Sequence, residues 1–290
     1  MRFLVPFPKV KDFHKPGKPL VPNCYGIFYV LVSVCYWFIL VFLGIMETEA
    51  IALTSSVLFG STMGLFDDIT DLRWRYKAIL PVFAALPYTV LQPSDRTAIS
   101  LLLIGVVRLG ELFFIVLVPL VVTVTTNVYN QLGGLNGLES LTGLIVLIGL
   151  TMASETEGGV LLSIVPILCL LVLGYISYRG KAFIGNIGSF SIGLTLAVYA
   201  ALMNVKSVLL ISLIPFIFNS LLILYSNYII HDKADTEMDE NGLLYSKRIR
   251  SLRTLILHYK RLNEHQTVIV ICIIIAFFTI LGVSIQKLMI

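Results

Sequence analysis

Long apolar runs, separated by short polar segments, make up most of the chain. Nine of them come close to the length of about 20 residues that an α-helix needs to cross a bilayer. They cover residues 26–46, 50–66, 76–91, 112–129, 141–153, 160–178, 182–203, 208–230 and 267–286. A spanning segment must pair its backbone polar groups internally, so the pattern predicts an all-α fold: a polytopic integral membrane bundle of about nine transmembrane helices. A further apolar run, residues 97–107, covers only half a bilayer and predicts a re-entrant or surface hairpin.

Composition supports this class and indicates one membrane domain over residues 1–290. Hydrophobic residues make up 57% of the 290 and charged residues only 13%, which excludes an ordinary soluble domain. Residues 231–266 form the only sizeable polar loop between the predicted spans. The four cysteines show no paired spacing, so the sequence implies neither a zinc site nor a disulfide framework.

The distribution of Lys and Arg predicts an orientation. Of the 21 such residues, all but Arg96, Arg108, Lys206 and Lys287 fall on one side of the predicted spans. Because basic residues accumulate on the cytoplasmic side of membrane proteins, this side is expected to be cytoplasmic. It carries residues 67–77, 130–139 and 185–186 together with the loop at 231–266. We therefore expect an active site that faces the cytoplasm.

The segment of residues 64–77 concentrates charge between two apolar runs, with three acids and three bases. One interpretation is a basic membrane anchor whose aspartates are merely solvated. The adjacent pair Asp67 and Asp68 argues against it, because neighbouring carboxylates repel each other most where the dielectric constant is low. These two side chains need a cation, a proton or a lysine.

Four polar loops on one face of a membrane bundle suit an enzyme that joins a charged soluble substrate to a lipid. A basic rim attracts phosphates, and Asp and Asn oxygens suit a hard cation such as Mg²⁺, with Mn²⁺ as the alternative. Phosphoryl transfer is the economical chemistry, since a metal, a lysine and a carboxylate would supply its main requirements.

Four segments resemble the polyprenyl-phosphate N-acetylhexosamine-1-phosphate transferase family, most of all its dolichyl-phosphate branch in eukaryotes and archaea. They are Asp12-x-x-Lys15-Pro16-Gly17-Lys18-Pro19-x-Val21-Pro22, Asp67-Asp68-x-x-Asp71-Leu72-Arg73-Trp74-Arg75-Tyr76-Lys77, Thr126-Asn127-x-x-Asn130-x-Leu132-x-Gly134-x-Asn136-Gly137-Leu138-Glu139 and Gly185-Asn186-x-Gly188-Ser189. The resemblance implies transfer of N-acetylhexosamine-1-phosphate, with GlcNAc-1-phosphate expected, from a UDP-sugar to a polyprenyl or dolichyl phosphate. It also implies a location in the lipid bilayer, in the plasma membrane of a prokaryote or the endoplasmic reticulum of a eukaryote. We expect no nucleic-acid partner, and a homodimer stays open.

The resemblance also implies roles for individual residues. Those expected to act in catalysis are Asp67, Asp68 and Lys77. Those expected to bind substrate are Asn127, Asn136, Trp74, His231 and Lys233. Those expected to bind the metal are Asn130 and Asn186.

Two departures leave alternatives open. Asn186 stands where the family usually has a metal-binding aspartate, so a catalytically weakened member is one alternative. No apolar span precedes the first polar loop, whereas the family usually has ten spans. A transporter of lipid or nucleotide-sugar is a second alternative, although such proteins place charges along a path through the bilayer. The asparagines at 127, 130 and 136 could also be helix caps at the end of a span.

Overall fold

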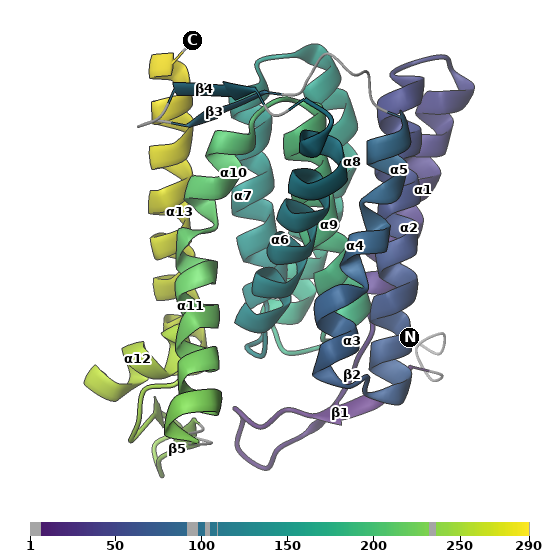
Figure 1. Cartoon of the computed structure of the whole chain (residues 1–290). Helices are drawn as coiled ribbons and strands as arrows, with labels where there is room; N and C mark the ends of the chain where they lie inside the picture. The colour runs from purple at the N-terminus through teal and green to yellow at the C-terminus, as the bar shows by residue number, and fades with distance from the viewer. Residues whose placement is uncertain (1–6, 92–97, 102–104, 109, 232–235, 290) are drawn as a thin grey trace.

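The structure, a computed structural model, is a bundle of roughly aligned helices with a β-hairpin at one end and two at the other (Figure 1). It describes residues 7–91, 98–101, 105–108, 110–231 and 236–289. The helices are α1 (Gly26–Phe42), α2 (Glu47–Thr70), α3 (Trp74–Ile79), α4 (Pro81–Ala84), α5 (Leu86–Leu91), α6 (Val118–Leu132), α7 (Leu138–Ser154), α8 (Glu157–Tyr178), α9 (Gly185–Leu202), α10 (Lys206–Ser212), α11 (Ile214–Tyr225), α12 (Leu252–Tyr259) and α13 (Glu264–Met289). The paired strands are β1 (Lys9–Lys11) with β2 (Leu20–Pro22), β3 (Ala98–Leu101) with β4 (Gly105–Arg108), and β5 (Glu237–Met238) with β6 (Leu244–Tyr245).

The helical membrane architecture expected from the apolar runs is confirmed. Within the described part of the chain, five helices are long and apolar enough to cross a bilayer, or six if the bent pair of α10 and α11 forms one span. Two further apolar helices, α1 and α7, have 17 residues each. The run at 76–91 forms three short helices, interrupted near Pro81 and Pro87, since proline cannot continue the backbone hydrogen-bond ladder. The predicted number of nine spans stays a prediction.

One local expectation is corrected and another is confirmed. The run at 50–66 was expected to end before the acidic pair, but α2 continues to Thr70 and carries Asp67 and Asp68 in its last turns. The run at 97–107 contains the antiparallel hairpin of β3 and β4, with Ala98 opposite Arg108, at the end of the bundle away from α12 (Figure 1). The hairpin that the sequence predicts over this run is therefore confirmed.

Helix α9 is the centre of the bundle, where it packs against α1, α2, α6, α7 and α10. Two close approaches place its N-terminal end. A Cβ at Gly26 of α1 would lie 2.1 Å from the Cα of Gly188, and a Cβ at Gly64 of α2 would lie 2.5 Å from the backbone O of Asn186. Because glycine has no Cβ, both helices can reach the first turns of α9. In contrast, α8 and α13 leave many apolar side chains exposed, as expected for helices that face lipid.

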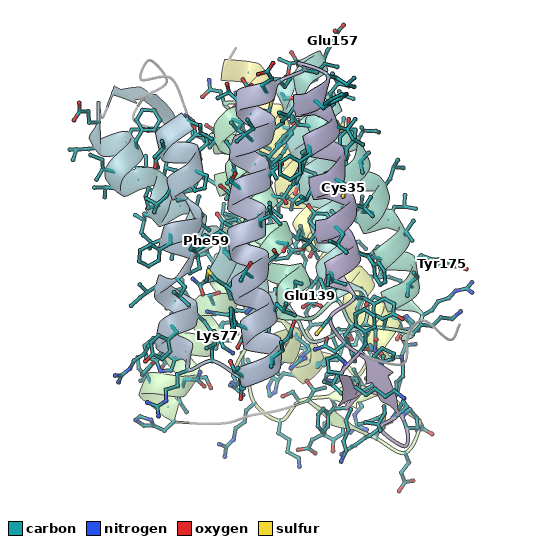
Figure 2. The ribbon with its side chains drawn as sticks, turned by 90° about the vertical axis from the view of Figure 1, so that its right-hand side faces the viewer. Cys35, Phe59, Lys77, Glu139, Glu157 and Tyr175 are labelled. Carbon is teal, nitrogen blue, oxygen red and sulfur yellow. The ribbon has the colours of Figure 1, made fainter. Side chains whose placement is uncertain are left out.

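The β1–β2 hairpin, the loop between α6 and α7, the start of α9 and helix α12 gather at one end of the bundle, opposite the β3–β4 hairpin (Figure 1). Figure 2 shows Lys77 and Glu139 toward this end and Glu157 at the other. Polar segments that are far apart in the sequence thus meet at one end of an apolar bundle.

Candidate active site

A cavity of about 410 Å³ opens at the polar end of the bundle. Its lining comes from the N-terminal segment, the end of α2, the loop before α7, the start of α9 and helix α12. These residues are Val10, Lys11, Phe13, His14, Asn23, Asp68, Gly133, Gly134, Glu139, Phe183, Gly185, Asn186 and Arg253. The expectation that the polar loops share one end is therefore confirmed for these segments.

Asp68 lies where α2 meets the start of α9. Its Oδ1 accepts hydrogen bonds from the backbone N of Asn186 at 2.9 Å and from Nδ2 of Asn23 at 3.3 Å, while its Oδ2 accepts from the backbone N of Ile187 at 2.9 Å. Residues four apart share a helix face, so the close approach at Gly64 directs Asp68 onto these amides. A carboxylate is stable there because the N-terminus of a helix carries unpaired N–H groups and partial positive charge.

Asp67 faces a different partner. It is 3% exposed, and its Oδ1 accepts from Lys77 Nζ at 2.8 Å and from the backbone N of Leu72 at 3.0 Å. Consecutive helix residues point about 100° apart, so the two carboxylates diverge. Both acids were expected to need a cation, a proton or a lysine. Lys77 meets this need at Asp67, whereas Asp68 accepts hydrogen bonds from backbone amides. Oδ2 of Asp67 is buried and has no hydrogen-bond partner among the described residues.

The oxygens near the cavity suit a hard cation. Asn186 and Glu139 line the cavity together with Asp68. Ser189, one helical turn after Asn186, donates through Oγ to Oδ1 of Asn130 at 2.5 Å. Burial, reinforced by the neighbouring Asp68 carboxylate, raises the pKa of Glu139 to about 8, so a cation in the cavity would favour its ionised form. Oxygen ligands with at least one free carboxylate are the set that Mg²⁺ prefers. The donors present therefore fit this metal.

Four of the expected substrate-binding residues are described, and none of them lines this cavity: Asn127, Asn136, Trp74 and His231. Asn127, on α6, donates through Nδ2 to the backbone O of Thr123 at 2.9 Å and to that of Ala78 at 3.4 Å. It therefore links α6 to α3, the helix that carries Lys77. Trp74 is 60% exposed and contacts the Tyr228 ring edge-on, with centroids 6.1 Å apart.

His231 is exposed. It follows the π-helical segment Ser226–Ile230 that continues α11, and its backbone is left-handed, with φ 55°. Lys233 lies outside the described residues. The role of either residue in substrate binding therefore stays a prediction.

Asn136 is buried behind the cavity wall and is 1% exposed. Its Nδ2 donates to Asp12 Oδ2 at 2.8 Å and to Glu264 Oε1 at 2.7 Å, and its backbone N donates to Glu264 Oε1 at 2.8 Å. These contacts join the N-terminal segment, the α6–α7 loop and the start of α13. The asparagine thus holds three parts of the chain together.

Comparison with known proteins identifies the family. The family model described as glycosyl transferase family 4 matches residues 50–204. The chain is 30% identical over 284 residues to the UDP-N-acetylglucosamine–dolichyl-phosphate N-acetylglucosaminephosphotransferase of Saccharolobus solfataricus, an alignment that covers 95% of this chain and 87% of the relative. The chain belongs to glycosyl transferase family 4.

Two other relatives of this glycosyl transferase carry the same name. The protein of Sulfolobus acidocaldarius is 30% identical over 298 residues, covering 95% of this chain and 87% of its own length. The protein of Dictyostelium discoideum is 34% identical over 100 residues, covering 30% of this chain and 24% of its own length. Membership of this family, together with the apolar helices, makes the chain an integral membrane protein.

Three residues that line the cavity of the glycosyl transferase had no role predicted from the sequence: Glu139, Phe183 and Arg253. Glu139 stands inside a motif, but its exposure to the cavity follows only from the fold. Arg253, on α12, and Phe183, just before α9, line the same cavity. No periodicity or spacing marks Arg253 within the charged loop at 231–266, so the sequence offered no signal for it. Phe183 stands two residues before the Gly185-Asn186 motif, which could have drawn attention to it.

Cys24 also contacts the site. Burial of the thiol, reinforced by the neighbouring Asp68 carboxylate, raises the pKa of Cys24 to about 12. The thiol therefore stays protonated at neutral pH and can act as a hydrogen-bond donor beside the carboxylate.

Proposed function

We propose that the protein transfers N-acetylglucosamine-1-phosphate from UDP-N-acetylglucosamine to a polyprenyl or dolichyl phosphate. The observation that carries this proposal is the cavity at the polar end of the bundle. It combines two carboxylates (Asp68 and Glu139), the amide of Asn186, the guanidinium of Arg253 and the ring of Phe183. Such a cavity offers ligands for a metal, a cation for a diphosphate and an aromatic face for a base.

In the proposed reaction, an oxygen of the lipid phosphate attacks the phosphorus that bears the sugar. The bond from this phosphorus to the bridging oxygen breaks, UMP leaves, and the lipid carries a diphosphate-linked sugar. The carboxylate of Asp68, held by backbone amides, would orient the attacking phosphate or accept its proton. Lys77, fixed by Asp67, would offset negative charge that develops on the transferred group.

A divalent cation, Mg²⁺ or Mn²⁺, is part of the proposal. Asn130, Asn186 and Glu139 would hold it, and when bound it would neutralise charge on the diphosphate. Asn186 has an amide where the family usually has a carboxylate, and Glu139 adds a carboxyl group to the lining of the same cavity. This argues against the catalytically weakened alternative.

The metal assignment predicts opposite effects of two substitutions. Asn186→Asp adds a negative ligand and should lower the Mg²⁺ concentration needed for half-maximal activity about tenfold, or about 1.4 kcal/mol. Glu139→Gln should raise it. Unchanged Mg²⁺ requirements in both variants, each folded and active, would remove these residues from the metal site.

Placement of charge favours an enzyme over a transporter. Among the described residues, the charged side chains that are buried are Asp12, Asp67 and Glu264, which lie in the segments at the polar end of the bundle. A transport path would need polar groups at the middle of the bilayer. We infer that UDP-N-acetylglucosamine arrives from the cytoplasm, in line with the excess of Lys and Arg at this end, while the lipid phosphate enters from the bilayer.

The test is lipid-dependent release of UMP. Purified protein, dolichyl or undecaprenyl phosphate and Mg²⁺ would be incubated with a panel of UDP-sugars. We expect UMP from UDP-N-acetylglucosamine only when lipid phosphate is present. Release from none of the sugars, by protein that stays folded, would overturn the proposal.

A further inference from the structure

Helices α1 and α8 are joined near the end of the bundle opposite the cavity. Tyr36 Oη donates to the backbone O of Leu161 at 2.7 Å, and Trp37 Nε1 donates to the backbone O of Leu162 at 2.9 Å. Pro166, inside α8, has no N–H, so the carbonyl of Leu162 four residues earlier has no helical donor. Trp37 supplies the missing donor, and this end of the helix pair is therefore closed.

Between this closed end and the polar end, α1 and α8 leave an apolar groove of about 530 Å³. Proline inside a helix bends it, and the groove begins beside Pro166. Its lining comes from residues between 25 and 32, at the start of α1, and from Val165, Leu168, Cys169, Val172, Leu173 and Ile176 on α8. The α8 residues recur every three or four positions, so they form one face of the helix. At a rise of 1.5 Å per residue this face is about 16 Å long, roughly the hydrocarbon thickness of one leaflet.

An aromatic cluster lies at the polar end of the groove. The rings of Phe7, Tyr25 and Phe28 pack against one another, with centroids 5.3 to 6.0 Å apart. Tyr25 and Phe28 also line the groove. Aromatic side chains accumulate where the hydrocarbon of a bilayer meets its head groups. The groove therefore runs from the membrane interface into the bilayer.

Two exposed cations follow α8 at this same end, Arg179 and Lys181. Arg179 comes three residues after Ile176 and so continues the face of α8 that lines the groove. Its guanidinium stacks on the ring of Tyr175, with Cζ 4.4 Å from the ring centroid. Stacking uses the flat side of the guanidinium and leaves its N–H edge for a phosphate.

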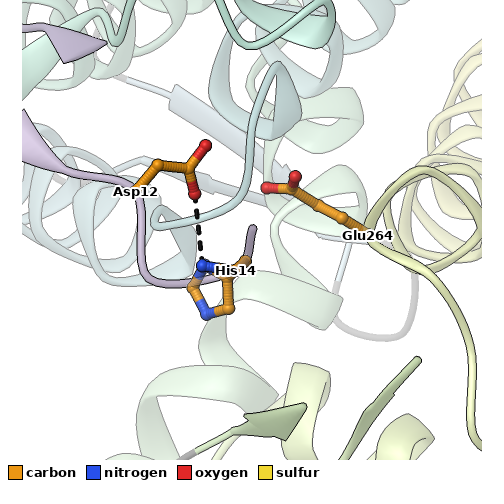
Figure 3. Close-up of side chains that lie close together, drawn as sticks. All are labelled: Asp12, His14 and Glu264. Carbon is orange, nitrogen blue, oxygen red and sulfur yellow. Dashed lines mark hydrogen bonds between the residues drawn. The ribbon is translucent and has the colours of Figure 1, made fainter. Parts of the chain in front are cut away.

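The acids near this basic end belong to a buried cluster. Gly180 borders the cluster, because a Cβ there would lie 3.7 Å from Asn136 Oδ1. Asp12 and Glu264, turned toward each other in Figure 3, are 0% and 6% exposed, and each accepts a hydrogen bond from the Asn136 amide. Lys15 Nζ lies 3.1 Å from Asp12 Oδ2. The charge of these acids is therefore buried and paired, whereas the two cations after α8 are exposed.

We propose that the groove binds one chain of an anionic membrane lipid and that Arg179 and Lys181 hold its phosphate head group. Leu168 and Val172 of the lining are 53% and 54% exposed, so the groove is open to the bilayer that supplies the chain. A chain in the groove makes dispersion contacts along both helices, and the two cations select a negative head group. The groove shares no lining residue with the cavity that contains Asp68, and the inference does not depend on the proposed reaction.

The lipid phosphate of the proposed reaction is the competing occupant. Its phosphate has to reach Asp68 and Lys77 to react. Figure 2 shows Lys77 and Tyr175 on opposite sides of α1 and α2, and Arg179 stacks on Tyr175. A phosphate held by Arg179 therefore lies away from the reacting groups, which favours a resident lipid over the substrate.

The first experiment identifies the lipids that the protein retains. Purified protein would be placed in vesicles of phosphatidylcholine and phosphatidylglycerol, extracted into detergent and examined by native mass spectrometry. We expect retained phosphatidylglycerol, in preference to phosphatidylcholine. The double variant Arg179→Ala and Lys181→Ala should lower this preference about tenfold, because both phosphate contacts are lost. Lys260→Ala removes an exposed cation after α12, at the same end of the bundle, and as the matched control it should keep the preference.

A second pair of variants tests the groove itself. Val172 lines it and is 54% exposed, whereas Leu171 is 55% exposed and does not line it. Val172→Trp should fill the groove and abolish retention of the lipid, while Leu171→Trp should not. A ligand that binds only the folded protein raises the temperature of unfolding. Phosphatidylglycerol should therefore stabilise wild type and Leu171→Trp against thermal unfolding in detergent, but not Val172→Trp.

Equal retention of the two phospholipids by wild type, or retention of phosphatidylglycerol that Val172→Trp leaves unchanged, would overturn the inference. A raised KM for undecaprenyl phosphate in Val172→Trp, but not in Leu171→Trp, would assign the groove to the chain of the substrate. A dimer that Val172→Trp dissociates, with no lipid retained by wild type, would assign it to a second copy of the chain. Either of these two results overturns the resident lipid and leaves the proposed function intact.

Discussion

Gly64→Ala tests how the fold positions Asp68. The added Cβ would lie 2.5 Å from the backbone O of Asn186 and 2.6 Å from the Cα of Ile187. Ordinary contact begins at 3.4 Å, so α2 and α9 would have to separate by about 0.9 Å. The hydrogen bonds from these two residues to Asp68 are both 2.9 Å long, and the same displacement would stretch them beyond hydrogen-bond distance.

The expected magnitudes follow from this displacement. Overpacking costs about 1–3 kcal/mol, and we expect the upper end because backbone atoms, not the tip of a flexible side chain, must move. A catalytic group displaced by about 1 Å can lose about 10²-fold in rate. UMP release should therefore fall by about that factor, and thermal unfolding in detergent should occur at a lower temperature.

The matched control is Gly174→Ala on α8, where a Cβ would meet side-chain atoms and no backbone: Leu141 Cδ2 at 3.0 Å, Leu141 Cγ at 3.5 Å and Ser140 Cβ at 3.7 Å. This variant should stay close to wild type in both assays. Wild-type activity and stability in Gly64→Ala would refute the argument that the glycine contact sets the position of Asp68.

Three further predictions concern residues in or beside the candidate site: Lys77, Arg253 and Cys24. Lys77→Met should destabilise the protein by about 3 kcal/mol, because it leaves Asp67 buried without its cation, and adding Asp67→Asn should recover most of this loss in thermal unfolding. Arg253→Ala should raise KM for UDP-N-acetylglucosamine about tenfold with a smaller change in kcat, if the guanidinium binds the diphosphate of the ground state. Cys24, with a pKa of about 12, should react slowly with maleimide at pH 8, where roughly one thiol in 10⁴ is ionised. The rate should rise with pH and in Asp68→Asn, since removing the carboxylate's charge lowers the pKa of the thiol.

Contrary outcomes are specific to each of these predictions. Equal stability of the Lys77 single variant and its double variant would mean that the lysine does not compensate Asp67. An unchanged KM in Arg253→Ala would mean that Arg253 does not bind UDP-N-acetylglucosamine. Fast labelling of Cys24 at pH 7, in a chain whose other three cysteines are replaced, would show an exposed thiol beside the site.

The class of fold could be predicted because it depends on a local property. A run of about 20 apolar residues can satisfy its backbone in lipid only as a helix, so composition and length sufficed. The β3–β4 hairpin was also predictable, because an apolar run that covers only half a bilayer has to turn back. The end of α2 was misjudged because charged residues can extend a membrane helix beyond its apolar part.

The candidate site was predictable only as far as the motifs reached. The adjacent acids were correctly expected to need compensation, but the sequence could not show that Asp67 uses Lys77 while Asp68 uses the amides of α9. The partners of Asn136 are 124 and 128 residues away in the chain, and no local pattern connects them. Contacts of this kind depend on how the helices pack and become visible only in the folded protein.

Labelled substrate can show whether the protein transfers the sugar together with its phosphate. UDP-N-acetylglucosamine carrying ³²P in the phosphate next to the sugar would be incubated with the protein, dolichyl phosphate and Mg²⁺. We predict label in the lipid fraction, release of unlabelled UMP, and a loss of about 10²-fold in rate for Asp68→Asn. Label that stays in a soluble nucleotide, or crosses a liposome membrane without reaching the lipid, would contradict it.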